Sequence, residues 1–409
     1  MMDKLGERVA AVLAIACIVV APFVQPPWFF SIIVVLFALI LLLIQKTKFF
    51  SLSIIALAIF YGIGLIPLFI FSCTLAFVVI GELVFRSVGE NVRSYFAYTL
   101  VAAASAVLIT LYTMYLQNTL YLPQPAPLTV LMGIIVAVLL KVILGDRDDA
   151  LMVEALGISM TMLLFSDLNY QVSVPLISVA VIIAFGFGYF AYRFKTADLS
   201  GLFSAALLGV LLIVFADVRW FLIMLAFFIA GSACTRYRYA EKEKFGVEQN
   251  RGGARGYRNV FANGGVSAAA AILFGVTQNP AFAAMFVGSV ATAAADTVAS
   301  EIGVTGGTPY MITTGKKVPA GTNGGVTLLG EMAALTCAIG ISATAFFLGV
   351  IDLTTLLICS IAGLVGTNID SLAGALIENR GYIGNAGTNV IGTLGGGLFA
   401  LAVYWALAA

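Results

Sequence analysis

The stretch NPAFAAMFVGSVATAAADTVASEIG, residues 279–303, carries no charged side chain before Asp296. An apolar run of this length fits a helix that spans the roughly 30 Å hydrocarbon core of a bilayer. Similar runs fill the chain: 61% of its 409 residues are hydrophobic and 10% are charged. Soluble domains carry about a quarter charged residues. The sequence therefore predicts an all-α, polytopic integral membrane protein.

About 15 apolar runs are long enough to predict membrane helices. Gly62-Ile63-Gly64 and Pro67 indicate a break between two of them. The predicted helices cover residues 8–24, 27–45, 49–64, 66–85, 94–117, 127–145, 149–166, 172–193, 197–216, 218–236, 260–276, 279–303, 325–350, 353–377 and 388–407.

The positively charged residues predict the orientation. With the N-terminus in the cytoplasm, these helices put every lysine and arginine except Arg219 on the cytoplasmic side, as the positive-inside rule requires. The N-terminal apolar run lacks a small-residue cleavage site, so we expect it to be a retained first helix. In a prokaryote the expected location is the cell or plasma membrane.

Composition also excludes several kinds of site. The net charge of +1 gives no support for nucleic-acid binding. The five cysteines show no CxxC spacing, which argues against a disulfide framework or a thiolate metal site. The chain contains no histidine, which removes His-dependent triads, His-ligated zinc and imidazole proton shuttles.

The texture of the sequence changes near residue 196. Residues 1–196 are almost uniform apolar helix with short charged turns, and the sequence assigns them no role. Residues 197–409 hold nearly all the Asn-Gly clusters and most of the membrane-embedded carboxylates. We therefore expect an N-terminal helical region of unknown role and a C-terminal catalytic domain with its site at the cytoplasmic face.

Amide and glycine residues recur at three predicted cytoplasmic helix starts. Asparagine can cap a helix, glycine allows close approach of a ligand, and the free N–H groups then face an anion. Ordinary capping with tight helix packing is the alternative for any one segment, but three on one face favour an anion site. The segments contribute Asn263, Gly264 and Gly265; Gly321, Thr322, Asn323 and Gly324; and Asn385, Thr388 and Asn389.

Carboxylates lie on the helices between these segments. Asp296, Ser300 and Gly303 share one helix face at positions i, i+4 and i+7, while Glu331 and Asp370 lie on the two following helices. An intramembrane carboxylate is costly without a partner. A structural pair with Lys or Arg would supply one. The functional alternative is a Mg²⁺ site formed by Asp296, Glu331 and Asp370 and completed by substrate phosphates.

Cations complete the predicted site. Lys316 and Lys317 lie between two glycine-bearing turns, and Arg258 precedes the first Asn-Gly segment together with Arg251 and Arg255. Such charges can simply reflect membrane topology, but a lysine pair between flexible turns is also suited to binding phosphate. The pattern is not a P-loop, because no GxxxxGK[ST] occurs. A predicted site that binds phosphate and a metal ion beside the lipid bilayer indicates phosphoryl transfer.

The ordered motifs ADTVASEIG (295–303), GKKVPAGTNGG (315–325) and GNAGTN (384–389) resemble the transmembrane protein 19 family, also called domain of unknown function 92. Plant phytyl-phosphate kinases belong to that family. The pattern is also similar to the dolichol kinase and phytol kinase group, which uses CTP or related nucleotides. The resemblance covers about residues 197–409.

This resemblance implies a prenyl-phosphate kinase that converts phytyl or geranylgeranyl monophosphate to the diphosphate with a nucleoside triphosphate, CTP in preference to ATP. It implies that Asp296 and Ser300 lie at the nucleotide–metal site and that Lys316 and Lys317 contact phosphates. Asp370 and the Asn-bearing segments would complete the site.

Three alternatives remain open from the sequence. A cytidylyltransferase that joins CTP to a lipid phosphate would need similar ligands. An ion-coupled secondary transporter would also use glycine-rich helices with acidic residues, although its site is expected near the membrane midplane. A purely structural membrane protein would bear the cost of the embedded acids without a use for them.

Overall fold

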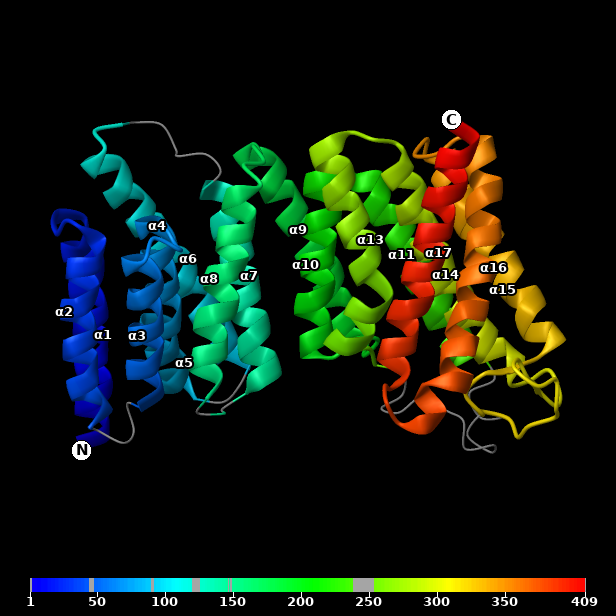
Figure 1. Cartoon of the computed structure of the whole chain (residues 1–409), viewed down its shortest axis with the longest axis horizontal. Helices are drawn as coiled ribbons and strands as arrows, with labels where there is room; N and C mark the ends of the chain where they lie inside the picture. Colours follow the sequence, from blue (N-terminus) through cyan, green and yellow to red (C-terminus); the bar gives the residue numbers. More distant parts are fainter. Residues whose placement is uncertain are drawn as a thin grey trace. The chain divides into compact units, whose positions relative to one another are not determined.

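The computed structural model describes residues 2–43, 48–89, 92–119, 126–145, 147, 149–237 and 254–408. Almost all of them are helical (Figure 1). The chain divides into two compact units, residues 1–177 and 178–409. This division falls near the start of α9 (Val174–Arg193), so most of α9 belongs to the second unit. The change in sequence texture at residue 196 lies at the other end of that helix.

The described residues of the first unit form apolar helices, with one π-helical stretch, η3. Its elements are α1 (Met2–Val20), η1 (Ala21–Phe23), α2 (Pro27–Leu42), α3 (Lys48–Gly62), α4 (Leu68–Leu75), η3 (Ala76–Gly81), α5 (Glu82–Val88), α6 (Val92–Leu116), α7 (Ala126–Leu144) and α8 (Ala150–Asp167). The predicted break is confirmed, because α3 ends at Gly62 and Pro67 is the N-cap residue of α4.

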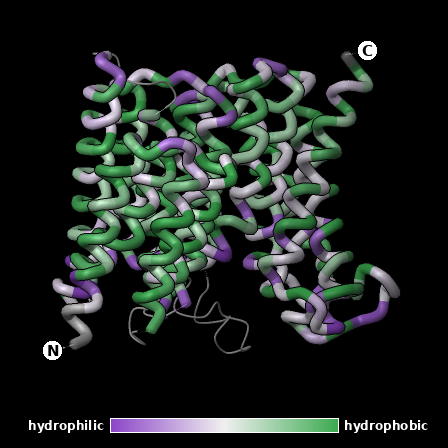
Figure 2. The backbone as a smooth tube through the Cα atoms, turned by 60° about the vertical axis from the view of Figure 1, so that its left-hand side comes forward, coloured by the Kyte–Doolittle hydropathy of each residue, from purple (hydrophilic) through white to green (hydrophobic). Residues whose placement is uncertain are grey.

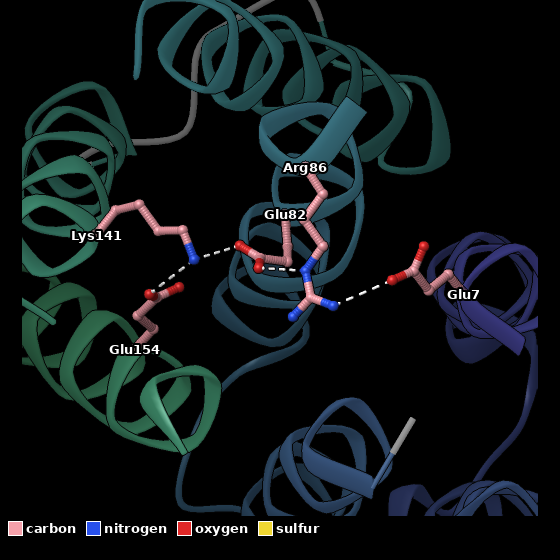
Figure 3. A network of polar contacts seen from close by, with 5 residues as sticks. All are labelled: Glu7, Glu82, Arg86, Lys141 and Glu154. Carbon is pink, nitrogen blue, oxygen red and sulfur yellow. Dashed lines mark hydrogen bonds and ion pairs between the residues drawn. The ribbon is translucent and has the colours of Figure 1, made fainter. Parts of the chain in front are cut away.

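Five charged side chains form one network inside the first unit (Figure 3). The ammonium group of Lys141 lies between the carboxylates of Glu82 and Glu154, 3.4 Å from Glu154 Oε1. The guanidinium of Arg86 lies 2.7 Å from Glu82 Oε1 through its Nε and 3.0 Å from Glu7 Oε1 through Nη1. Mutual pairing offsets the cost of holding these charges in an apolar bundle.

In its described residues, the second unit contains most of α9, seven further long helices and a small β-hairpin. Its elements after α9 are α10 (Leu199–Phe215), α11 (Val218–Arg236), α13 (Tyr257–Thr277), α14 (Ala281–Gly303), β1 (Tyr310–Met311), β2 (Gly325–Val326), α15 (Leu328–Phe347), α16 (Leu353–Leu376), η5 (Glu378–Arg380) and α17 (Asn385–Ala408). The two strands are antiparallel, with Tyr310 opposite Val326.

Twelve helices in the described ranges are long and apolar enough to cross a membrane, and the shorter apolar helices α2, α3 and α10 accompany them. Every predicted apolar run thus has a helical counterpart. Figure 2 shows hydrophobic residues along the helices and hydrophilic residues mainly toward their ends and in the loops. The predicted all-α, polytopic class is confirmed.

α14 is the central helix of the second unit. It packs against α11, α13, α15, α16 and α17, and most of its residues are buried. Small residues allow these contacts: a side-chain carbon on Gly288 would lie 2.6 Å from the Cβ of Ala400, and one on Gly363 would lie 3.2 Å from the Cβ of Ala291. The packing holds the last turns of α14 in place.

Because successive helices alternate in direction, one end of the second unit gathers the C-terminal ends of α9, α11, α14 and α16. The N-terminal ends of α10, α13, α15 and α17 lie at the same end (Figure 1). The β1–β2 hairpin and its flanking loops, residues 304–327, lie there as well, and we call this end of the second unit the hairpin end.

Candidate functional site

A cavity of about 260 Å³ lies at the hairpin end of the second unit. The last turns of α14 and α16, the first turn of α15 and the first residue of α17 form its walls, and residues 320–327 cover it. Nine of the residues predicted for the site line this cavity: Asp296, Ser300, Gly321, Thr322, Asn323, Gly324, Glu331, Asp370 and Asn385.

Acidic side chains dominate the wall that α14 and α16 share. Asp296, Ser300 and Gly303 follow one face of α14 and all line the cavity. Asp370 and Glu378 line it from α16 and the turn that follows, and their charges act on the Asp296 carboxylate. Negative charges that are close together in a site of low dielectric repel one another. The cavity is therefore suited electrostatically to a cation.

Two glycines, Gly303 of α14 and Gly330 of α15, bring the start of α15 close to the end of α14. The Cα of Gly330 lies 3.3 Å from the position of a side-chain carbon on Gly303. Thr327 caps α15, since its Oγ1 accepts from Gly330 N at 3.0 Å, and the same hydroxyl donates to Gly303 O at 3.3 Å. Glu331 consequently lies in the first turn of α15, where Asn368 Nδ2 donates to its Oε2 at 3.0 Å.

The cover of the cavity rests on α16 through glycine. Gly324 has φ of +81°, and a side-chain carbon there would lie 2.5 Å from the Cβ of Ala375 and 2.8 Å from Ser371 O. A side-chain carbon on Gly374 would lie 3.2 Å from Gly324 N. Glycine is required here both for the backbone conformation and for the close approach. The contact places the segment from Gly321 to Gly324 directly over the acidic wall.

Three side chains from three helices form a hydrogen-bonded chain that ends at the cavity. With the Asn389 amide oriented to match its neighbours, its nitrogen donates to Asp370 Oδ2 at 3.3 Å and to Asn385 O at 2.9 Å. Its oxygen accepts from Asn263 Nδ2 at 3.2 Å. Because α13, α16 and α17 each contribute one member, this chain fixes Asp370 relative to two neighbouring helices.

The prediction that Asn263 and Asn389 cap helices is wrong. α13 begins at Tyr257, so Asn263 lies inside the helix, and Asn389 lies inside α17, which begins at Asn385. The predicted helix start at residue 325 is also wrong, because Gly325 belongs to β2 and Thr327 caps α15. Tertiary hydrogen bonds rather than capping explain the first two residues.

The predicted cations lie outside the cavity. Lys316 and Lys317 are exposed on the loop between the strands and do not line it. Arg258 is exposed and lies over the ring of Tyr257. Arg251 lies outside the described residues. Gly264 and Asn263 line a second cavity, and Gly265 lines neither that cavity nor the acidic one. Thr388 and Asn389 are buried behind the acidic wall.

The predicted trio of metal ligands is not assembled. Within the described ranges, no group of three His, Cys, Asp or Glu side chains is arranged to hold a metal ion. Glu331 is held by Asn368 instead. Asp296 and Asp370 remain, and this donor set fits Mg²⁺, which proteins often bind through one or two carboxylates together with waters and substrate phosphates.

Two residues that organise the site, Thr327 and Asn368, were not among the predicted site residues. Thr327 stands directly before an apolar run, which is a typical signal for an N-cap. Asn368 is an amide within a membrane helix, a placement that usually marks an interhelical hydrogen bond. Both signals were present in the sequence.

The model of the family described as integral membrane protein DUF92 matches residues 182–400, which contain every lining residue of the cavity. The uncharacterized membrane protein sll0875 of Synechocystis sp. is 33% identical over 204 residues, 49% of this chain and 79% of that protein. The uncharacterized membrane protein MJ0933 of Methanocaldococcus jannaschii is 30% identical over 214 residues, 52% of this chain and 88% of that protein.

Protein VTE6, chloroplastic, of Arabidopsis thaliana is 33% identical over 211 residues, 49% of this chain and 63% of VTE6. No solved structure matches the chain. The family region falls within the second unit and leaves the first unit outside the match.

Proposed function

Because this chain belongs to the DUF92 family of integral membrane proteins, we propose that its second unit is a prenyl-phosphate kinase. It transfers a phosphoryl group from a nucleoside triphosphate to phytyl or geranylgeranyl monophosphate. The main support is one observation: Asp296 and Asp370 face the same cavity beneath a glycine-rich cover, at an end of the membrane helices. The similarity to VTE6 and to a family that includes phytyl-phosphate kinases supports the same class of reaction.

The nucleotide occupies the cavity at the hairpin end. Ser300 donates to its phosphates, and backbone N–H groups from Gly321 to Gly324 lie over them. Asp296 and Asp370 would hold Mg²⁺, which supplies neutralisation of the developing charge when it is bound with the nucleotide. CTP is the expected donor, by the resemblance to the dolichol kinase and phytol kinase group.

The chemistry needs little beyond positioning and charge. A phosphate oxygen of the prenyl monophosphate attacks the terminal phosphorus of the nucleotide, and the bond from that phosphorus to the bridging oxygen of the nucleoside diphosphate breaks. The acceptor is already anionic at neutral pH, so no general base is required. The absence of histidine from the chain is compatible with this reaction.

The orientation of the helices relates the site to the bilayer. A cavity at the helix ends lies at the depth of the lipid headgroups, where the phosphate of a prenyl lipid also lies. A secondary transporter would be expected to hold its substrate near the midplane. We propose that the hairpin end faces the cytoplasm, following the positive-inside distribution.

Product analysis tests the proposed function. Purified protein in nanodiscs receives Mg²⁺, geranylgeranyl monophosphate and CTP, ATP, UTP or GTP in turn. Formation of geranylgeranyl diphosphate and nucleoside diphosphate is the expected result. Pyrophosphate release with a cytidylylated lipid would identify the cytidylyltransferase instead. Lack of turnover combined with ion-coupled uptake in liposomes would favour the transporter.

A further inference from the structure

A second cavity, of about 50 Å³, lies between α9, α10, α11 and α13, and we call it the apolar groove. It shares no lining residue with the acidic cavity. Its walls include the side chains of Phe187, Leu208, Phe221, Met224, Leu225 and Phe228. The polar residues that line it are Arg255, Asn259 and Asn263.

Arg255 is a buried cation at this groove. It is 8% exposed, and no carboxylate of the described residues lies within ion-pair distance of it. Its guanidinium lies 5.1 Å and 5.2 Å from the ring centroids of Phe227 and Phe228. Burial lowers the pKa of Arg255 to about 10, against the opposing charge of Glu301, so the side chain stays positive at neutral pH. A buried cation of this kind is suited to an anionic ligand.

Arg255 also reaches toward the acidic cavity. Its Nη2 occupies the space that a side chain on Gly231 of α11 would need, and Thr297 of α14 lies at the same place. Thr297 follows Asp296 in the chain, and Glu301, whose charge acts on Arg255, lines the acidic cavity. The guanidinium therefore lies beside the last turns of α14, close to both cavities.

The polarity of the groove runs along the membrane normal. Both Arg255 and Asn259 lie at the hairpin end: Arg255 comes just before α13, and Asn259 lies in its first turn. Phe221 and Met224 lie in the first turns of α11, which begins at the opposite end. The groove thus has a cationic mouth at the headgroup level and an apolar inner part, which matches the head and chain of a single-chain anionic lipid.

Asn263 independently indicates a ligand site at this groove. It is 3% exposed and lines the groove, and its Oδ1 has no hydrogen-bond partner among the described residues. A buried polar atom without a partner is costly. A phosphate hydroxyl, or a water bound to the phosphate, would donate to it. The other atoms of the amide connect this position through Asn389 to Asp370.

We propose that the apolar groove is the acceptor site, where Arg255 binds the phosphate of the prenyl monophosphate and the groove encloses the first carbons of its chain. This assignment rests on the proposed kinase function and adds the location of its lipid substrate. A cavity of about 50 Å³ has room for roughly three to five water-sized groups. The remainder of the chain therefore lies in the lipid, and catalysis tolerates different chain lengths.

Substitution of Arg255, at the mouth of the groove, tests lipid binding separately from nucleotide binding. Arg255→Gln should raise KM for geranylgeranyl monophosphate by about 10- to 100-fold, because it removes hydrogen bonds to a charged group. The Kd of Mg-CTP should stay unchanged, and Arg255→Lys should restore lipid binding in part. Arg236→Gln, an exposed arginine at the same end, is the control. Weaker nucleotide binding with an unaltered lipid KM would overturn the assignment.

A photoreactive geranylgeranyl monophosphate, with its diazirine near the phosphate, locates the lipid directly. Adducts should fall on α10, α11 and α13 and should disappear in Ala205→Phe, which fills the groove, but not in Ile229→Phe on the exposed face of α11. Adducts elsewhere would refute the acceptor site even if turnover is normal. Adducts in the groove of a protein that makes no diphosphate would instead refute the kinase and leave the lipid site standing.

Discussion

Gly324 of the hairpin end and Gly374 of α16 meet with no side chain between them: a carbon on Gly374 would lie 3.2 Å from the amide nitrogen of Gly324. This contact holds the cover of the acidic cavity against the wall that carries Asp370. The distance between the cover and the carboxylates therefore depends on two residues without side chains.

Gly324→Ala should lower kcat/KM by about 10-fold or more. The new methyl group would meet Ala375, and the positive φ would add strain of order 1 kcal/mol. Gly315→Ala separates the two causes, because Gly315 has φ of +64° but no atom within 4 Å of an added carbon. Steady-state kinetics on both variants show whether the close contact or the backbone strain causes the loss. Equal losses would show that close approach to α16 is not what the site needs.

Asp296→Asn and Asp370→Asn should each reduce kcat by about 100-fold or more if these carboxylates hold the metal and its phosphates. Each should also raise the Tm of the ligand-free protein, since one of two repelling charges is removed. The control is Asp352→Asn at the other end of α16, where asparagine caps a helix as well as aspartate does. Full activity of Asp296→Asn would remove that residue from the site.

Glu331→Gln tests whether Glu331 binds the metal or only Asn368. A glutamine oxygen can still accept from Asn368 Nδ2, so we expect most of the activity and the same Mg²⁺ dependence. Glu331→Ala leaves the Asn368 amide without this acceptor and should cost about 1–3 kcal/mol of stability. These quantities are measured by Mg²⁺ titration and thermal unfolding. A large shift in the Mg²⁺ requirement of Glu331→Gln would restore Glu331 as a ligand.

The lysine pair should act at long range. Because Lys316 and Lys317 are exposed and outside the cavity, their joint replacement by glutamine should leave kcat unchanged and raise KM for the nucleotide by a few-fold at low salt. The difference from the wild type should vanish at about 0.5 M salt, where exposed charges are screened. A fall in kcat that persists at high salt would instead require direct contact with the phosphates.

Lys141→Met should strongly destabilise the first unit, because it leaves Glu82 and Glu154 buried without their shared cation. Breaking a buried pair typically costs about 3–5 kcal/mol. Adding Glu154→Gln to Lys141→Met should recover part of the loss. Unfolding in detergent, followed by tryptophan fluorescence, measures both variants. No recovery in the double variant would indicate that Lys141 matters for packing and not for charge.

The helices were predictable because each depends on a local property, an apolar run matched to the bilayer. The same holds for the shared face of Asp296, Ser300 and Gly303, since helical spacing alone brings them together. Their grouping with Asp370 followed from alternating helix directions, which the predicted topology already contained.

The roles of Asn263 and Asn389 were not predictable by the same means. An asparagine beside glycine is a typical helix start, but these two amides pair with each other and with Asp370 across three helices. The partner of a side chain in another helix is a property of tertiary packing. The positions of Lys316 and Lys317 also depend on tertiary structure: they lie on the exposed loop between β1 and β2, outside the cavity that residues 320–327 cover.

Packing around α14 determines which parts of the second unit can change during turnover. Thr292 fits into space left by Gly366 and Gly396 on two neighbouring helices, and Gly288 meets Ala400. Displacement of α14 by one residue would replace these matched positions by colliding methyl groups. This helix is therefore the wall of the cavity least able to shift, and we expect residues 304–327, which cover the cavity, to move when the proposed nucleotide enters or the product leaves.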